Sequence, residues 1–140
     1  MRHLILLAVA LSLVALTGCG GERRVSVAGN VTLDGEPIPE GSITFIPDQG
    51  NHGPTAGGEI IDGEYRVESA SGPMTGPHRV EIRATVRTGR SVPDPRFPGA
   101  RIEEVRDLIP ARYKTGKPEG LLTCNLQAGD NTVNLNLTSR

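Results

Sequence analysis

The thiol of Cys19 is the one nucleophile in the sequence whose surroundings specify a reaction. It follows the small residues Thr17-Gly18 and an apolar segment from residue 4 to residue 16, and the chain starts with the basic Arg2. A positively charged start, a short apolar segment and small residues before a cleavage point are typical of an export signal. The segment is shorter than the ~20 residues that a membrane-spanning helix needs. The sequence therefore predicts a cleaved signal peptide over residues 1–18.

The order Leu16-Thr17-Gly18-Cys19 resembles the lipobox of bacterial lipoproteins, in which the cysteine thiol receives a diacylglycerol and the preceding bond is then cut. This implies that Cys19 is the lipidated first residue of the mature chain and that residues 19–24 form a lipidated tether. Several acyl chains hold a protein on a membrane, because each buried methylene contributes ~0.8 kcal/mol. The alternative is a buried helix that contains a cysteine, but Gly20-Gly21 would interrupt it abruptly.

Cys124 is the second thiol, and it has no intramolecular partner if Cys19 is lipidated. It lies on the apolar side of the alternating segment 122–126, so we expect a free thiol that packs as a small buried hydrophobic group. The alternative is a reactive or intermolecularly paired thiol. Reactivity would require a partly exposed, electropositive setting.

No other group of residues indicates catalysis or metal binding. His52 and His78 have no metal-ligand spacing with each other or with Cys124, and we expect both to be solvated. Four acidic residues are expected near one end of the fold, but their spacing matches no calcium loop and we interpret them as solvated turns. These are Asp34, Glu36, Glu40 and Asp48. Nucleophile-elbow, zinc-protease and phosphate-loop motifs are absent. We expect no catalytic residue, no metal and no cofactor.

Composition limits the classes of partner. Without residues 1–18 the chain carries 14 Lys and Arg against 16 Asp and Glu. This near-neutral, mixed surface predicts neither nucleic-acid binding nor a polybasic membrane patch. The remaining length fits a single domain, which we place at residues 25–138.

Short segments of alternating apolar and polar residues predict about seven antiparallel strands. They cover residues 25–33, 42–46, 55–61, 64–68, 78–87, 121–127 and 132–137. Asp34-Gly35 and Asp62-Gly63 predict tight turns, and Gly29 suggests a bulge. Strands at this spacing predict one all-β domain, an antiparallel β-sandwich with Greek-key connections. Phe45 and Tyr65 are its expected buried aromatic residues.

Residues 88–109 interrupt this pattern, because closely spaced prolines cannot donate to a ladder. We predict a long loop here, with a helical turn or a short extended piece over residues 102–109. Its segment 91–99 is the candidate interaction loop, and the candidate residues are Pro93, Pro95, Phe97 and Pro98. An exposed Phe97 would contact a partner; the alternative is that it covers one end of the core.

Three motifs in order resemble the carboxypeptidase regulatory-like domain, a transthyretin-like β-sandwich. They are residues 29–39, residues 62–67 and residues 75–82, although His78 stands where an aromatic residue is usual. The segments 110–114, 121–123 and 131–133 are similar to the ending of small planctomycete-type lipoproteins. The resemblance implies a non-catalytic accessory role and brings no catalytic residues. The chain ends Leu137-Thr138-Ser139-Arg140 and lacks the Tyr-Arg-Gly-Ser of hydroxyisourate hydrolases.

The sequence thus predicts an exported lipoprotein in the cell envelope, on the periplasmic or outer face of a bacterial membrane. Its β-sandwich would be a non-catalytic accessory or binding module. Its predicted partners are the membrane, through Cys19, and an envelope protein, through segment 91–99 or an unpaired edge strand. Two alternatives stay open: an oligomeric transthyretin-like ligand binder or hydrolase that uses His52 or His78, and a purely structural envelope component. The ligand and the oligomeric state are also open.

Overall fold

The structure is a computed structural model that describes residues 23–115 and 120–140. The predicted signal peptide, residues 1–18, and the predicted lipidation site Cys19 lie outside the described residues. Within the described ranges, no helix has the length and apolar character needed to cross a membrane.

The described chain is all-β, as the alternating sequence predicts. Its strands are β1 (Ser26–Leu33), β2 (Glu36–Pro37), β3 (Glu40–Pro47), β4 (Ala56–Ile61), β5 (Glu64–Val67), β6 (Gly76–Pro93), β7 (Arg101–Asp107), β8 (Leu122–Leu126), β9 (Asp130–Thr132) and β10 (Leu135–Leu137). One short 3₁₀ helix, η1 (Ala111–Tyr113), precedes β8.

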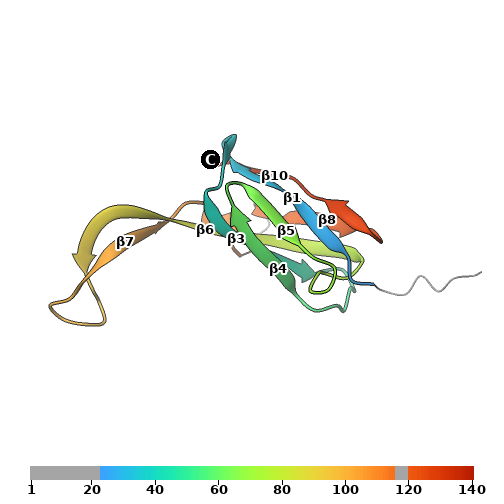
Figure 1. Cartoon of the computed structure of the whole chain (residues 1–140), viewed down its shortest axis with the longest axis horizontal. Coiled ribbons are helices and arrows are strands. Elements are labelled where there is room, and N and C mark those ends of the chain that lie inside the picture. Colours follow the sequence, from blue (N-terminus) through green and yellow to red (C-terminus); the bar gives the residue numbers. More distant parts are fainter. Residues whose placement is uncertain (1–22, 116–119) are drawn as a thin grey trace, which may run out of the picture.

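The strands form a curled sheet in the order β10-β1-β5-β4-β3-β6-β7, with β2 and β9 also paired to β1 and β8 paired to β6. The sheet wraps around one core in the manner of a β-sandwich (Figure 1). Neighbouring strands are antiparallel, except that β9 and β10 run parallel to β1. The predicted all-β sandwich is confirmed, and this parallel ladder is a detail that local patterns do not specify.

Alternation along each strand supplies the core. Val27 and Val31 of β1 and Ile82 of β6 have no exposed surface. The rings of Phe45 and Tyr65 pack with centroids 6.1 Å apart and planes tilted by 44°. Burial of a side chain such as Phe45 contributes ~1.5–3 kcal/mol to the stability of the fold. The inward-facing apolar side chains are therefore the main source of the stability of the sheet.

The Asp-Gly pairs form the turns that the sequence predicts. Asp34 and Gly35 have φ of 50° and 88°, and Asp62 and Gly63 have φ of 50° and 80°. Positive φ at both central residues is the type I′ geometry that suits the twist of a hairpin. These two turns join β1 to β2 and β4 to β5.

Gly29 does not mark a bulge, because β1 keeps an unbroken ladder with β5 from Val27 to Asn30. A side chain at this position would place its Cβ 2.0 Å from the carbonyl oxygen of Val133. Tyr65 Oη donates to the same oxygen at 2.7 Å, and the Val133 amide donates to the Ala28 carbonyl at 2.9 Å. Gly29 therefore permits the C-terminal segment to close against β1.

The predicted loop over residues 88–109 is wrong. β6 continues through it to Pro93, and β7 returns alongside, with pairs from Thr85↔Asp107 to Pro93↔Arg101. This two-stranded ribbon, residues 85–107, projects from the sandwich and is called the arm (Figure 1). The prolines are compatible with it because Pro93 ends the ladder while Pro95 and Pro98 lie in the connecting tip. Of the two forms predicted for residues 102–109, the short extended piece is correct: residues 102–107 belong to β7, and a bend follows at residues 108–109.

Candidate functional site

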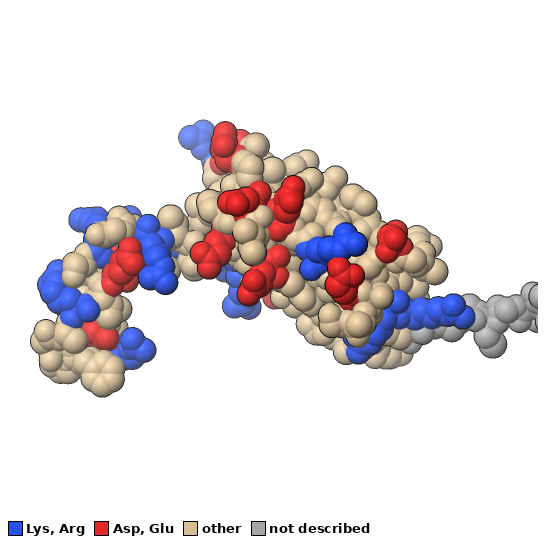
Figure 2. All heavy atoms as spheres, viewed as in Figure 1, with Lys and Arg blue, Asp and Glu red and all other residues tan. Residues whose placement is uncertain are grey.

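The arm is the most unusual surface of the described chain. Four of the six exposed large hydrophobic side chains in the described residues lie on it: Val86, Phe97, Ile102 and Val105. Figure 2 shows basic side chains interspersed with acidic ones along the arm, and Asp and Glu side chains gathered on the sandwich where the arm joins it. Exposed apolar groups within a charged rim are typical of interaction surfaces.

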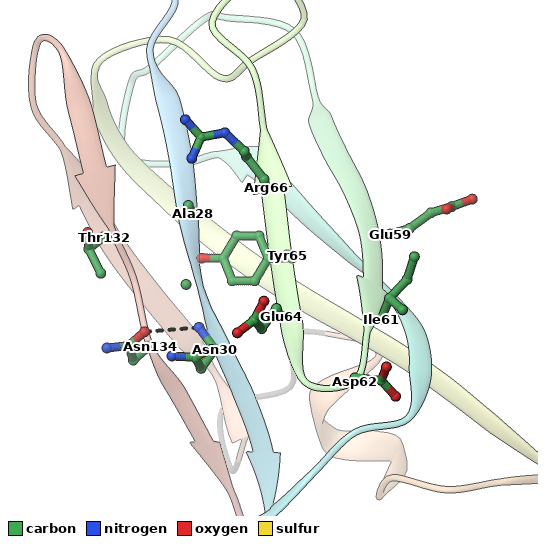
Figure 3. Close-up of a pocket in the computed structure, with 11 residues that line it drawn as sticks. Ala28, Asn30, Glu59, Ile61, Asp62, Glu64, Tyr65, Arg66, Thr132 and Asn134 are labelled. Carbon is green, nitrogen blue, oxygen red and sulfur yellow. Dashed lines mark hydrogen bonds between the residues drawn. The ribbon is translucent and has the colours of Figure 1, made fainter.

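A shallow hollow on the outer face of β1, β5 and the C-terminal strands is a second candidate (Figure 3). Two of its polar residues bond to each other, since Asn134 Oδ1 accepts the Asn30 amide at 2.9 Å. The Tyr65 ring borders it, but the hydroxyl donates to the Val133 carbonyl, and burial raises the pKa of that hydroxyl. The described residues that line the hollow include no nucleophile with an adjacent base. We therefore interpret the hollow as an ordinary surface of the sheet.

At the arm tip, Phe97 is 64% exposed. The alternative that Phe97 covers one end of the core is therefore wrong, since the tip lies at the far end of the arm (Figure 1). Pro93, Pro95 and Pro98 are also exposed. The structure thus brings the four candidate interaction residues together at one projecting end.

The tip is held in shape by Asp94, whose side chain is buried. Its Oδ1 accepts the Arg96 amide at 2.8 Å and Arg96 Nε at 3.3 Å. The Asp94 amide donates to the Ala100 carbonyl at 2.9 Å, and the Ala100 amide donates to the Phe97 carbonyl at 3.0 Å. The Arg96 guanidinium lies over the Phe97 ring, 6.0 Å from its centroid. Phe97 is therefore presented from an ordered turn.

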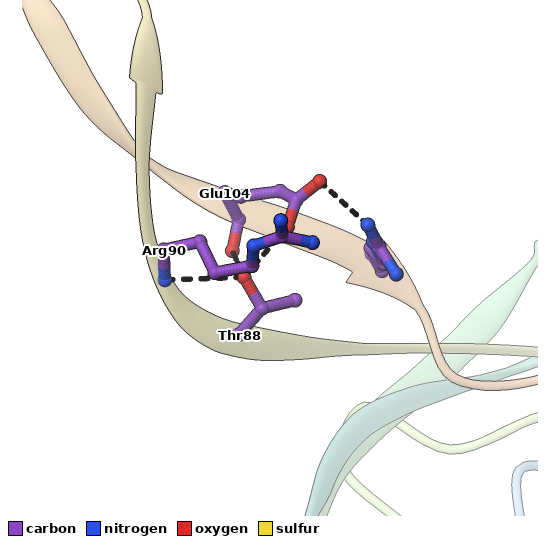
Figure 4. A network of polar contacts seen from close by, with 4 residues as sticks. Thr88, Arg90 and Glu104 are labelled. Carbon is purple, nitrogen blue, oxygen red and sulfur yellow. Dashed lines mark hydrogen bonds and ion pairs between the residues drawn. The ribbon is translucent and has the colours of Figure 1, made fainter.

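Halfway along the arm, the register shifts between Arg87 and Ser91, where β6 bulges opposite Glu104. The Thr88 hydroxyl donates to Glu104 Oε2 at 2.8 Å, and Arg106 donates to Glu104 Oε1 at 2.9 Å (Figure 4). Arg106 and then Thr88 hold the pKa of the Glu104 carboxyl below its usual range. Gly89, with φ of 72°, supplies the left-handed residue of the bulge. A bulge bends a ribbon, so this network sets the direction in which the tip points.

The histidine predictions have different outcomes. His52 is exposed, as expected, but the prediction of a solvated His78 is wrong because its ring is fully buried. His78 occupies an inward position of β6, opposite Cys124 of β8 and Pro47 of β3. Its Nδ1 lies 3.0 Å from the Gly76 carbonyl oxygen, and its Nε2 has no hydrogen-bond partner among the described residues.

Cys124 is free within the described ranges and packs against the core, but it is half-buried rather than fully buried. Burial raises the pKa of its thiol to about 11. A thiol that stays protonated near neutral pH is a poor nucleophile. This placement agrees with the packing role that the alternating segment predicts.

The expectation that four acidic residues share one end of the fold is wrong for Asp48. Glu40 begins β3 next to the arm base, whereas Asp48 follows the other end of the same strand. The structure instead brings Glu59, Asp62 and Glu64 to the arm end, where Glu40 lies. The sequence analysis did not single out these three residues. The Asp62-Gly63 turn could have indicated them, because a hairpin brings the residues on either side of its turn close together. No group of three potential ligands among the described residues is suited to a metal ion.

In comparisons with known proteins, no family model, no curated protein and no solved structure matches this chain. The resemblance to the carboxypeptidase regulatory-like domain therefore remains a prediction from its motifs.

Proposed function

We propose that the chain is an exported lipoprotein, anchored to a bacterial membrane through Cys19, that uses the arm as a non-catalytic binding element for an envelope protein. The observation that carries the binding role is the exposed Phe97 on an ordered tip at the end of the arm. A tip that is already ordered loses little conformational freedom when it binds, which favours recognition.

The course of the chain supports this arrangement. The described chain begins at Arg23, at the end of the sandwich opposite the arm (Figure 1). An anchor at Cys19 would lie only a few residues before Arg23, so the arm would point away from the membrane. A projecting element on the far side of the domain is placed to meet a partner.

A non-catalytic role is supported by the placement of the candidate acid–base groups. Of the two histidines that a transthyretin-like binder or hydrolase would use, His78 has a fully buried ring that cannot contact a ligand in this conformation, and His52 is exposed in the loop between β3 and β4. Tethering alone would not explain an arm that exposes four large hydrophobic side chains. These observations favour the binding module over both alternatives.

The anchor is tested by fractionation of cells that express the full chain or Cys19→Ala. We expect the wild type in the membrane fraction, with an acylated N-terminal cysteine by mass spectrometry. Cys19→Ala should lack the acyl mass and retain residues 1–18, because the cut before residue 19 follows acylation. An unmodified wild-type cysteine would contradict the anchor.

The binding role is tested by replacing Phe97 with the photo-crosslinker p-benzoylphenylalanine in the full chain. Thr123, exposed on the outer face of β8, is the matched control position. We expect a discrete crosslinked product from position 97 and none from position 123. Equal crosslinking at both positions, or none at position 97, would overturn the proposed role of the tip.

A further inference from the structure

We infer that the arm tip binds a second copy of this chain, in a groove at the base of the partner's arm. This inference rests on the proposed function of the arm and names its partner. The groove, called here the acidic groove, is lined by Pro39, Glu40, Gly41, Glu59, Ile60 and Ile61.

An exposed isoleucine ringed by carboxylates is the main feature of the acidic groove. Ile61 is 59% exposed on the outer face of β4. Its cross-strand partners are Glu40 on β3 and Glu64 on β5. Directly opposed residues of neighbouring strands share a face, and so do residues two apart on one strand. Glu40, Glu64 and Glu59 therefore surround Ile61 on the same face.

These carboxylates are not neutralised within the molecule. Among the described residues, none of Glu40, Glu59 and Glu64 lies in an ion pair. Arg83 and Arg87 at the arm base are engaged by Glu81 and Glu103. The acidic groove thus offers an apolar contact within an uncompensated negative rim.

The arm tip has the opposite charge around a similar apolar centre. Phe97 lies next to Arg96, whose side chain is 72% exposed, and the exposed Arg101 begins β7 at the far end of the arm. Arg96 pairs with Asp94, whereas Arg101 has no carboxylate partner among the described residues and its Nε donates to Ser91 Oγ at 3.0 Å. An aromatic residue within a positive rim complements an isoleucine within a negative one.

The two surfaces of one molecule cannot meet. Thr85↔Asp107 marks the base of the arm and Pro93↔Arg101 marks its far end, eight residues along β6. At ~3.3 Å per residue the tip lies roughly 25 Å from the base, and a paired ribbon cannot fold back on itself. The tip can therefore contact the acidic groove of another molecule and not that of its own.

In a reciprocal pair, the arm tip and the acidic groove of each molecule are both in contact with the other molecule. Each tip would lie at the base of the other arm, so the two arms would run side by side in opposite directions. Within the described chain, no strand pairs with the outer edges of the arm, which leaves backbone groups free for such a neighbour. A closed pair related by two-fold symmetry uses each contact twice. The structure therefore assigns a dimer rather than an open filament.

Charge reversal tests this dimer in the full lipidated chain, purified in detergent and measured by sedimentation velocity. The tip variant is Arg96→Glu with Arg101→Glu, and the groove variant is Glu40→Lys with Glu59→Lys. Each alone sets like charges against each other and should raise the dimer dissociation constant at least ~10-fold. An equimolar mixture restores opposite charges at both contacts and should recover the dimer. Arg23→Glu with Arg24→Glu, at the opposite end, is the charge-matched control and should leave the constant unchanged.

A monomeric wild type, reversed variants that dimerise like the wild type, or a mixture that stays monomeric would each overturn the inference. Photo-crosslinking from position 97 separates this failure from failure of the proposed function. A product of twice the chain mass supports the dimer, and isotope-labelled copies should show crosslinks from position 97 to peptides of the acidic groove. A product with a different protein overturns the dimer while it leaves the binding role of the tip intact. No product overturns both.

Discussion

The sandwich and the arm are built from the same strand, yet β6 behaves differently in its two halves. From His78 to Ala84, every second side chain is buried against the core. Beyond Thr85, no side chain of β6 is buried, and the arm is held by its ladder and by the contacts of Glu104. The sandwich is stabilised by burial and the arm by polar contacts that water competes for. Damage to the arm should therefore affect binding, and damage to the sandwich should affect folding.

The largest expected effect is that of Gly29→Ala in the sandwich. Its Cβ would lie 2.0 Å from the Val133 carbonyl oxygen, so the C-terminal segment must move away from β1. We expect the free energy of unfolding to fall by roughly 3 kcal/mol or more, measured by urea denaturation. The contrasting variant replaces residues 88–104 with Asn-Gly between the paired Arg87 and Val105. It should retain the wild-type stability to within about 1 kcal/mol, and an equal loss in both would refute the contrast.

Substitutions of His78 should separate packing from polarity. His78→Ala leaves a cavity in the core and should lower the free energy of unfolding by about 2 kcal/mol. His78→Phe keeps an aromatic ring, somewhat larger than imidazole, and removes the unpartnered Nε2, so we expect it to destabilise the chain less than His78→Ala. Thermal and urea unfolding of both variants measure this. A Phe variant as unstable as the Ala variant would assign an essential role to the Nδ1 contact with Gly76.

The Cys124 thiol reports on the same core. Burial raises its pKa from 9.0 to about 11, so at pH 8 its thiolate fraction is roughly 100-fold below that of an ordinary cysteine. Alkylation by iodoacetamide, followed by mass spectrometry, should be slower by about that factor in the folded chain. Urea should abolish the difference.

The sign of the pH dependence follows from the same shift. The folded state favours the protonated Cys124 thiol, so its contribution to stability is complete below pH 9 and is lost as the pH rises toward about 11. Urea denaturation between pH 8 and pH 11 should show this loss in the wild type. Cys124→Ala should lose less stability over that interval, and an identical pH profile would contradict the assignment.

The smallest effect is expected within the arm, from Glu104→Gln. It replaces the carboxylate that Arg106 and Thr88 hold, so amide hydrogen exchange at residues 88–90 should become a few-fold faster at pH 7. The wild type should keep this protection above the ordinary carboxyl pKa and lose it as the pH falls through the lowered pKa of Glu104. Glu103→Gln, outside the bulge, is the control. Faster exchange in the sandwich strands would contradict the separation of the two regions.

The local sequence was sufficient for the elements of the sandwich. Alternating Val, Ile and Leu residues predict the strands, and the pairs Asp34-Gly35 and Asp62-Gly63 predict their turns, because side-chain period and positive φ are properties of a few adjacent residues. The same local reading singled out Phe97 and its prolines. The role of Cys19 also comes from a local motif and remains a prediction.

Only the tertiary structure determined which strand segments pack against the hydrophobic core. The alternating pattern of residues 78–87 does not show that β6 leaves the core after Ala84 and continues to Pro93, paired with β7 as an arm. His78 is buried because β3 and β8 pair on either side of it. Glu40, Glu59 and Glu64 surround Ile61 because three strands bring them to one face. Burial and charge complementarity depend on neighbours that are distant in the chain, and only the folded sheet specifies them.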